Sequence, residues 1–237
     1  MMLLLFLAAV VSSPVQTTAR MRAAPASTPT PASAMSPNAL AALRQFKDAV
    51  AAEQAAFQTL PVANGAGPNL AVRVALEQAM RRAIDPAVAT LSDGDRAAAS
   101  AVIWQRIGEV DAANTAYVKS ILPADGWFRS RRDGADVARN AWLIVQHSPD
   151  QAFQRVVVTR MRPLVASGDA RGPDYALLYD RTEMFAGRPQ LYGSQMTCVS
   201  GRWQAAQTVD PASLDRRRAD MGLPPMAEYL KNFEGGC

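Results

Sequence analysis

The chain has 237 residues, enough to bury a sizeable apolar core. Hydrophobic residues make up 49% and charged residues 19%, which is the composition of a globular protein and excludes a disordered one. The chain has 25 basic and 21 acidic residues, so its formal net charge is only +4. The arginine runs at 129–132 and 216–218 are too short for a basic nucleic-acid-binding stripe, and we interpret both as solvated faces.

The N-terminus is typical of an export signal. An uninterrupted apolar run from Met1 to Val11 is too short to span a bilayer but matches a signal-peptide core. The small residues Thr17-Thr18-Ala19 offer a cleavage site, so residues 1–19 are predicted to be removed. We therefore expect an exported protein, periplasmic or secreted, without an integral membrane segment after cleavage. No basic residue precedes the apolar run, and a misplaced start codon would leave a cytoplasmic protein as the alternative.

Residues 20–37 are rich in Pro, Ala, Ser and Thr, which predicts a disordered linker before one globular domain over 38–237. The domain has two cysteines, Cys198 and Cys237. In an oxidising compartment they would close a loop of about 40 residues, worth about 4 kcal/mol on the chain-entropy model. A buried Cys198 with a free terminal thiol is the alternative, and two cysteines with one histidine do not predict a zinc site.

Three helices are predicted first. Asn38 is predicted to cap the first helix, whose apolar residues at helical spacing are Leu40, Leu43, Phe46, Val50 and Phe57. The helix-breaking residues Pro61, Gly65, Gly67 and Pro68 are predicted to end it. The second carries Leu70, Val74, Met80 and Ile84. The third begins after Ser92, with Trp104, Ile107, Val110, Tyr117 and Ile121 on its apolar face. A turn follows at 122–128, and we expect Trp127 and Phe128 to fill the core.

The only histidine, His147, lies at the joint between two further helical patterns. A fourth helix is predicted over 135–146. The sequence Ser148-Pro149-Asp150-Gln151 has the form of a capping box and predicts a fifth helix over 149–165. His147 would then lie just outside a helix N-terminus, where its side chain can face a cleft.

The pattern changes after a short helical stretch that ends near Asp180 and Arg181. Residues 189–199 alternate between apolar and polar, and a turn at Ser200-Gly201-Arg202 lets residues 203–209 return as a second strand. A two-stranded hairpin is not stable alone, so it must pack on the helices. The predicted fold is therefore mainly α, with about six to seven helices and a C-terminal β-hairpin.

Several blocks occur in a fixed order: "WLIVQH", "FQ", "LLYDR", "RPQLYGSQ" and "RRRADMGLPPMAEYL". This set resembles domain-of-unknown-function family 6624 over roughly residues 126–230, with Ser194 where the family usually has Thr. The resemblance implies a shared fold and a shared site, but no activity.

The blocks supply one candidate site. His147 with Asp180 would form a general base and its orienting carboxylate. The ligand-binding candidates are Gln146, Arg181, Gln190, Tyr192 and Gln195, of which Arg181 can clamp a carboxylate or phosphate. We expect these residues to converge in space. No cofactor or metal ligand set is predicted.

Three interpretations remain open from the sequence. The first is an exported protein that binds a small polar or anionic ligand at this cluster. The second is a small exported enzyme, a hydrolase or lyase, with His147 as the general base. The third is a structural envelope protein in which the cluster is a buried polar network.

Overall fold

The computed structural model describes residues 35–60 and 66–234 and confirms the predicted fold class. This part of the chain is mainly helical and carries one antiparallel hairpin, β1 with β2. The helices are α1 Pro37–Ala49, α2 Ala51–Gln58, α3 Ala66–Val88, α4 Asp93–Ser120, α5 Ser130–Asp133, α6 Ala135–His147, α7 Gln151–Ala166, α8 Gly172–Phe185, α9 Leu214–Asp220 and α10 Met226–Leu230. The strands are β1 Met196–Val199 and β2 Arg202–Ala205.

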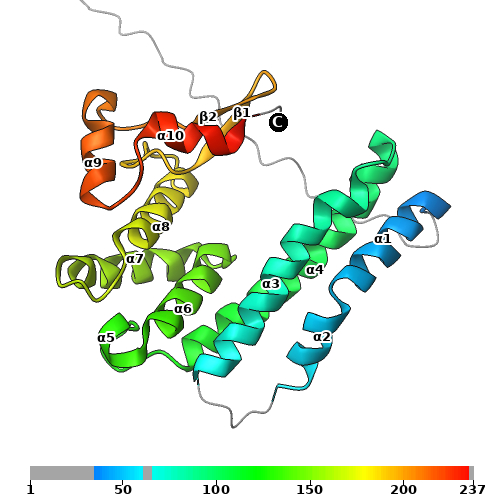
Figure 1. Ribbon diagram of the computed structural model, residues 1–237, viewed down its shortest axis with the longest axis horizontal. Coiled ribbons are helices and arrows are strands. Elements are labelled where there is room, and N and C mark those ends of the chain that lie inside the picture. The colour runs from blue at the N-terminus through cyan, green and yellow to red at the C-terminus, as the bar shows by residue number, and fades with distance from the viewer. Residues whose placement is uncertain (1–34, 61–65, 235–237) are drawn as a thin grey trace, which may run out of the picture.

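Two long neighbouring helices, α3 and α4, form the centre of the molecule (Figure 1). The helices α1 and α2 pack along one side of this pair, and α6 packs on both of its members from the other side. The remaining helices continue outward from α6 through α7 and α8 to the hairpin, α9 and α10. None of the helices in the described ranges is both long enough and apolar enough to cross a bilayer.

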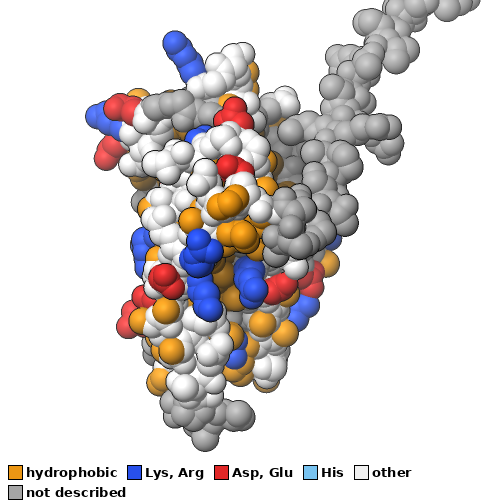
Figure 2. All heavy atoms as spheres, turned by 90° about the vertical axis from the view of Figure 1, so that its right-hand side faces the viewer, with side chains coloured by type: hydrophobic (Ala, Val, Ile, Leu, Met, Phe, Trp, Pro, Cys, Tyr) orange, Lys and Arg blue, Asp and Glu red, His pale blue; other side chains and the backbone are white. Residues whose placement is uncertain are grey.

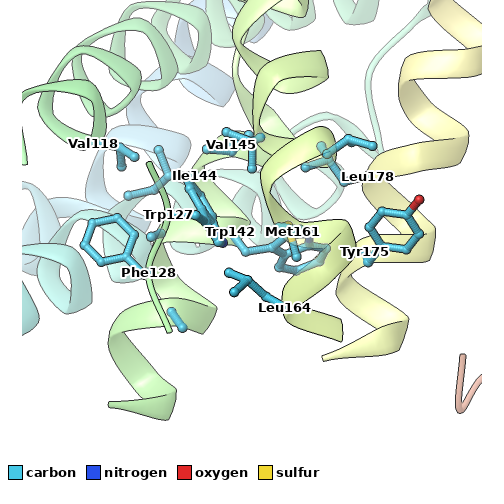
Figure 3. Close-up of a cluster of buried hydrophobic side chains, with 14 of the residues drawn as sticks. Val118, Trp127, Phe128, Trp142, Ile144, Val145, Met161, Leu164, Tyr175 and Leu178 are labelled. Carbon is cyan, nitrogen blue, oxygen red and sulfur yellow. The ribbon is translucent and has the colours of Figure 1, made fainter. Parts of the chain in front are cut away.

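Buried apolar side chains form two separate clusters. One is built by α1, α3 and α4 around Phe46, Leu76 and Ile103. The other is built mainly by α6, α7 and α8, and it includes the predicted core pair Trp127 and Phe128 (Figure 3). Those two side chains are 2% and 3% exposed and meet edge to face, as the sequence predicted. Both α3 and α4 contribute to each cluster, so polar residues between the two apolar stretches lie at their junction.

The first predicted helix is in fact two. Ser36, not Asn38, caps α1 by accepting the Ala39 backbone N–H, with Pro37 in the first turn. Val50 interrupts the helix and points into the core, and α2 begins after it. Gly67 and Pro68, which were predicted to separate the first two helices, belong instead to the first turn of α3.

The third predicted helix is confirmed, including its Ser92 cap, but its apolar face is not as predicted. Trp104 is 53% exposed, whereas the neighbouring Ile103 is fully buried. Ile107 is buried as predicted, and the buried face then continues with polar Asp111, Asn114 and Thr115 before it reaches Val118. The sequence prediction was wrong here because it assigned the largest apolar side chain to the core.

The joint between α6 and α7 also differs from the prediction. His147 is the last residue of α6, and Ser148 ends that helix instead of capping the next. The N-cap of α7 is Asp150, whose carboxylate accepts the Phe153 N–H at 2.9 Å. The Ser148 hydroxyl stabilises the joint by accepting the Asp150 N–H at 3.0 Å. The predicted capping box was therefore displaced by two residues.

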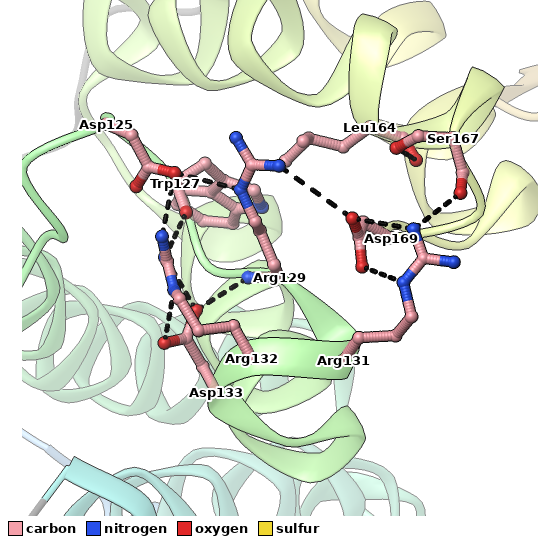
Figure 4. Close-up of polar contacts among 9 residues, drawn as sticks. All are labelled: Asp125, Trp127, Arg129, Arg131, Arg132, Asp133, Leu164, Ser167 and Asp169. Atoms are coloured by element: carbon pink, nitrogen blue, oxygen red, sulfur yellow. Dashed lines mark hydrogen bonds and ion pairs between the residues drawn. The ribbon is translucent and has the colours of Figure 1, made fainter.

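Both arginine runs are bonded and are not simply solvated faces. In the first, Arg132 bridges Asp125 and Asp133, and Arg131 reaches Asp169 on the loop after α7 (Figure 4). In the second, Arg218 is 0% exposed and donates to the backbone carbonyl of Tyr192 at 2.6 Å. A guanidinium offers five donors, and here they are used to bind loops together.

Candidate functional site

The structure divides the predicted site residues into two groups. Asp180, Gln190, Tyr192 and Gln195 lie together at the base of the hairpin. His147 and Arg181 lie instead beside the polar junction between the two apolar clusters. Asp180 and Arg181 are neighbours on α8, yet they contribute to different groups.

Asp180 binds the loop that precedes β1. Its carboxylate accepts three backbone N–H groups, those of Leu191, Tyr192 and Ser194, at 2.8–3.1 Å. Burial raises the pKa of this carboxyl, and the same backbone N–H groups act in the opposite direction. Asp180 is 0% exposed, and its three bonds to backbone N–H groups make it an anchor for the hairpin. The predicted pairing of Asp180 with His147 was wrong.

Gln190 and Gln195 continue this backbone bonding. The Gln190 amide accepts the Gln195 N–H at 2.7 Å and donates to the carbonyls of Gln195 and Ala206. The Gln195 amide donates to Leu177 on α8. Two glutamines therefore connect the loop to both the hairpin and a helix, which is a structural use of these side chains.

Tyr192 packs in a group of three tyrosines with Tyr175 and Tyr179, at ring separations of 5.9–6.5 Å. Burial raises its pKa to about 12. Gly193 follows it with φ +63°, a conformation that favours glycine, and lets the loop turn toward β1. This half of the predicted cluster is thus closely packed around the hairpin.

His147 has a different carboxylate partner from the one predicted. Its Nδ1 lies 3.0 Å from Glu77 Oε1 on α3, across 70 positions of sequence. The Glu77 side chain is 0% exposed, whereas that of His147 is 18% exposed. When Glu77 is ionised it can only accept, so Nδ1 is then the donor, and in a neutral ring Nε2 is the acceptor.

We define the polar layer as Arg73, Glu77, Arg81, Asp111, Asn114, His147 and Arg181. Arg81 forms an ion pair with Asp111 at 2.8 Å, and Arg73 donates to Asn114 at 3.1 Å, so both contacts join α3 to α4. Burial raises the pKa of Asp111, while its bond to Arg81 lowers it.

Arg181 enters the polar layer from α8. Burial lowers the pKa of its guanidinium, the charge of Arg81 lowers it further, and that of Asp111 raises it. Asp111 is also within electrostatic reach of His147. His147 and Arg181 therefore adjoin one group of charges, as the sequence analysis expected, although the other members were not foreseen.

The polar layer contains more hydrogen-bonding capacity than its members use. Within the described residues, five of its buried side-chain atoms have no hydrogen-bond partner: Arg73 Nε, Glu77 Oε2, Asp111 Oδ1, Asn114 Nδ2 and Arg181 Nε. Buried polar groups are nearly always paired, since leaving one unpaired costs about 1–3 kcal/mol. Both unpartnered acceptors and unpartnered donors are thus gathered around the His147–Glu77 pair.

Gln146, the remaining predicted ligand-binding residue, is buried on α6 beside His147 in sequence. Its backbone carbonyl accepts from the Gln154 amide at 3.3 Å, and its side-chain Oε1 has no hydrogen-bond partner within the described residues. No group of three His, Cys, Asp or Glu residues in the described ranges is arranged to hold a metal ion.

Comparison with known proteins gives one match. The profile described as "Family of unknown function (DUF6624)" matches residues 69–236. The chain belongs to this family. No curated protein and no solved structure matches the chain.

The DUF6624 match extends further toward the N-terminus than the blocks that carried the resemblance. It includes α3 and α4 almost completely, and hence Glu77, Arg81 and Asp111 as well as His147 and Arg181. Sequence reasoning missed the first three because single charged residues on long helices are usually solvated. The available signal was helical spacing: Glu77 lies three residues from both Val74 and Met80, and Asp111 lies four residues after Ile107, so each falls on an apolar face.

Proposed function

We propose that this DUF6624 protein binds a small polar ligand with an anionic group in the polar layer. The observation that supports the proposal is the set of unpartnered buried donors and acceptors around His147 and Glu77. A purely structural network of buried charges is stable only when its members are satisfied, because each unmet group retains its desolvation cost.

The charges of the polar layer indicate the chemistry of the ligand. Its three guanidinium groups face two carboxyl groups, so an added anion would improve the balance. Glu77 Oε2 and Asp111 Oδ1 have no hydrogen-bond partner within the described residues, so the ligand should also carry a donor group, such as a hydroxyl or an amine. His147 and Arg81 have side chains that are 18% and 20% exposed, and these provide the solvent-facing edge of the site.

A hydrolase or lyase is the second candidate function, and one contact favours it. A histidine whose Nδ1 is held by a buried carboxylate has its Nε2 oriented to take a proton from a bound molecule. In this version Glu77, rather than Asp180, orients the imidazole. The Ser148 hydroxyl is used at the end of α6 and is not offered as a nucleophile.

A thermal-shift experiment tests the binding proposal. The panel is phosphate, malonate, citrate and aspartate, measured with the full chain and with the variants Arg181→Leu and Arg155→Leu. Arg155 is an exposed arginine on α7 and serves as the control. A ligand at about a hundred times its Kd stabilises the native state by about 2.7 kcal/mol. We expect at least one anion to raise Tm in the parent and control but not in Arg181→Leu; equal shifts in all three proteins, or none, would contradict the proposal.

We also propose that the chain is exported after removal of residues 1–19. The supporting feature is the apolar N-terminal run, which lies outside the described residues, as does most of the predicted linker. N-terminal sequencing of protein recovered outside the cytoplasm should begin near Arg20. Recovery of intact Met1 from the cytoplasmic fraction alone would contradict export.

The Cys198–Cys237 disulfide stays a prediction, because Cys237 lies outside the described residues. Mass spectrometry of the exported protein under non-reducing conditions should show the mass of two fewer hydrogens than the reduced chain. Two alkylatable thiols would contradict the pairing.

A further inference from the structure

A second feature, whose lining shares no residue with the polar layer, has the character of a ligand site. A groove of about 670 Å³ runs between α1–α2 and the α3–α4 pair. Its apolar lining includes Leu40, Leu43, Phe46, Val102 and Ile103. This volume lies in the range of about 300–1,000 Å³ that is usual for small-molecule pockets.

The edges of the groove are basic. Arg44 and Lys47 on α1 and Arg106 on α4 line it, and no acidic residue does. All three are exposed and form no ion pair with another described residue. Figure 2, which views the molecule from the α1 side, shows blue basic side chains flanking orange hydrophobic ones. The groove therefore combines an apolar floor with basic side chains that line it and form no ion pair within the described residues.

We infer that this groove binds an anionic amphiphile, a single aliphatic chain with a carboxylate or phosphate head group. The chain would cover the apolar side chains between the two helix layers, with a gain of about 25 cal/mol per Å² of apolar surface removed from water. The head group would meet Arg44, Lys47 or Arg106 at the rim, where a guanidinium can bind an anion through two hydrogen bonds. Charge complementarity selects this occupant over a neutral or cationic one.

Isothermal titration of the full chain with dodecanoate, below its micellar concentration, tests the inference. The matched probe is dodecyltrimethylammonium, which has the same chain and the opposite charge. We expect saturable one-to-one binding of dodecanoate and binding of the cation that is weaker by about tenfold or more.

Three variants locate the site. Arg44→Glu/Arg106→Glu should weaken dodecanoate binding by about tenfold or more, since two attractive charges become repulsive. Ala55→Trp, on the α2 side of the groove, should abolish binding by filling it. Arg155→Glu, an exposed charge reversal on α7, should leave binding unchanged. The circular dichroism spectrum and Tm of each variant verify that it is folded.

Equal binding of both probes would overturn the inference, as would dodecanoate binding that survives Ala55→Trp in a folded variant. Sedimentation velocity provides a further check on the occupant. A parent dimer that the Arg44→Glu/Arg106→Glu variant dissociates would assign the groove to a second copy of the chain and would also overturn the inference.

Discussion

His147 and Glu77 join α6 to α3 at the junction of the two apolar clusters. The carboxylate of Glu77 is fully buried, and its Oε1 is bonded by the His147 imidazole at 3.0 Å and by the Gln78 amide at 3.4 Å. The second oxygen has no hydrogen-bond partner within the described residues. Truncating the histidine would therefore leave the buried carboxyl with only the longer bond, 3.4 Å, that the neighbouring Gln78 amide donates to Oε1.

Substitution of His147 separates the structural contribution of the side chain from its chemical one. His147→Ala should lower the free energy of unfolding by about 1–3 kcal/mol, because the buried Glu77 loses the closer of its two donors. In His147→Asn the side-chain amide takes the place of Nδ1–H, so we expect a loss below about 1 kcal/mol.

Urea unfolding of the two variants measures this difference, and a ligand or activity assay shows whether Nε2 is required. His147→Asn should be stable but inactive if the imidazole handles a proton. Equal stability of the Ala variant and the parent would contradict the role assigned to the His147–Glu77 contact.

At the residue scale, sequence reasoning identified side chains more reliably than it identified their partners. His147, Arg181 and the hairpin glutamines were predicted to form a site. The glutamines instead bond the backbone around the hairpin, and the use of His147 and Arg181 in a site stays a prediction. The pairing of His147 with Asp180 was wrong, because the actual partner lies 70 positions away on a helix that no local pattern connects to it. Three-dimensional packing alone brings α3, α4, α6 and α8 to one place.

At the scale of elements, the α6–α7 joint determines where the His147 side chain lies. Asp150 caps α7, so His147 ends α6 and remains on the helix face that meets α3. Gln154 adds to the joint by donating to the carbonyls of Val145, Gln146 and Ser148. The joint therefore has a fixed geometry, and the orientation of His147 follows from it.

Removal of the Asp150 cap should destabilise the protein. Asp150→Ala loses a hydrogen bond to a helix N-terminus, which costs about 1 kcal/mol, and an exposed ion pair with Lys119 that is worth less. Lys119→Ala removes only the ion pair and is the control. Chemical denaturation should give a larger loss for Asp150→Ala; equal losses would contradict the assignment of Asp150 as the cap.

Two glycines provide a matched test of helix packing. A Cβ on Gly172, at the start of α8, would lie 2.6 Å from the Met221 carbonyl oxygen, so one backbone must move. Gly108, in the interior of α4, has no atom within 4 Å of its Cβ position. Gly172→Ala should cost about 1–3 kcal/mol, whereas Gly108→Ala should stabilise by about 0.5–1 kcal/mol.

Thermal unfolding of the two alanine variants provides the measurement. A Gly172→Ala variant as stable as the parent would show that the α8–α9 contact is looser than described. The result for Gly108→Ala is the internal reference for the intrinsic helix preference of alanine.

Helix positions were largely predictable because periodicity is a local property. The interruption at Val50 was not, since that residue suits a continuous helix and is turned inward by the core around it. The exposure of Trp104 was missed for a related reason: the buried face of α4 changes from apolar to polar at Asp111 in order to meet Arg81 and Arg73.

At the scale of the whole molecule, two apolar clusters supply the stability and a polar layer separates them. Buried ion pairs rarely stabilise a protein more than apolar residues of similar size would. A layer that retains unmet hydrogen-bonding groups is therefore better explained by binding than by stability.

The acid stability of the molecule should depend on the arginine–aspartate contacts around α5. Bonds from Arg132 lower the pKa of Asp125 and Asp133, and a bond from Arg131 lowers that of Asp169. Because the folded-state pKa values lie below the ordinary value of 3.8, the stabilisation is complete above that pH and is lost as pH falls through the folded-state values.

Tm measured from about pH 6 down to about pH 2 checks this expectation. The variant Asp125→Asn/Asp169→Asn should lose less stability on acidification than the parent does. The buried carboxyl groups of Asp111, Asp174 and Asp180 have raised pKa values, so their contribution to the pH dependence of stability has the opposite sign. For this reason the test compares the Tm–pH curve of the variant with that of the parent. Parallel curves would contradict a role for the contacts.

The single histidine allows the central claim, that the polar layer is a ligand site organised by His147 and Glu77, to be tested directly. Nitrogen NMR of the histidine-labelled chain reports one imidazole only. The account predicts a proton on Nδ1, donated to Glu77, and a Nε2 resonance that moves when the stabilising anion of the thermal-shift panel is added, but not in Arg181→Leu. A proton on Nε2 in the neutral ring, or ring resonances that no anion moves, would contradict it.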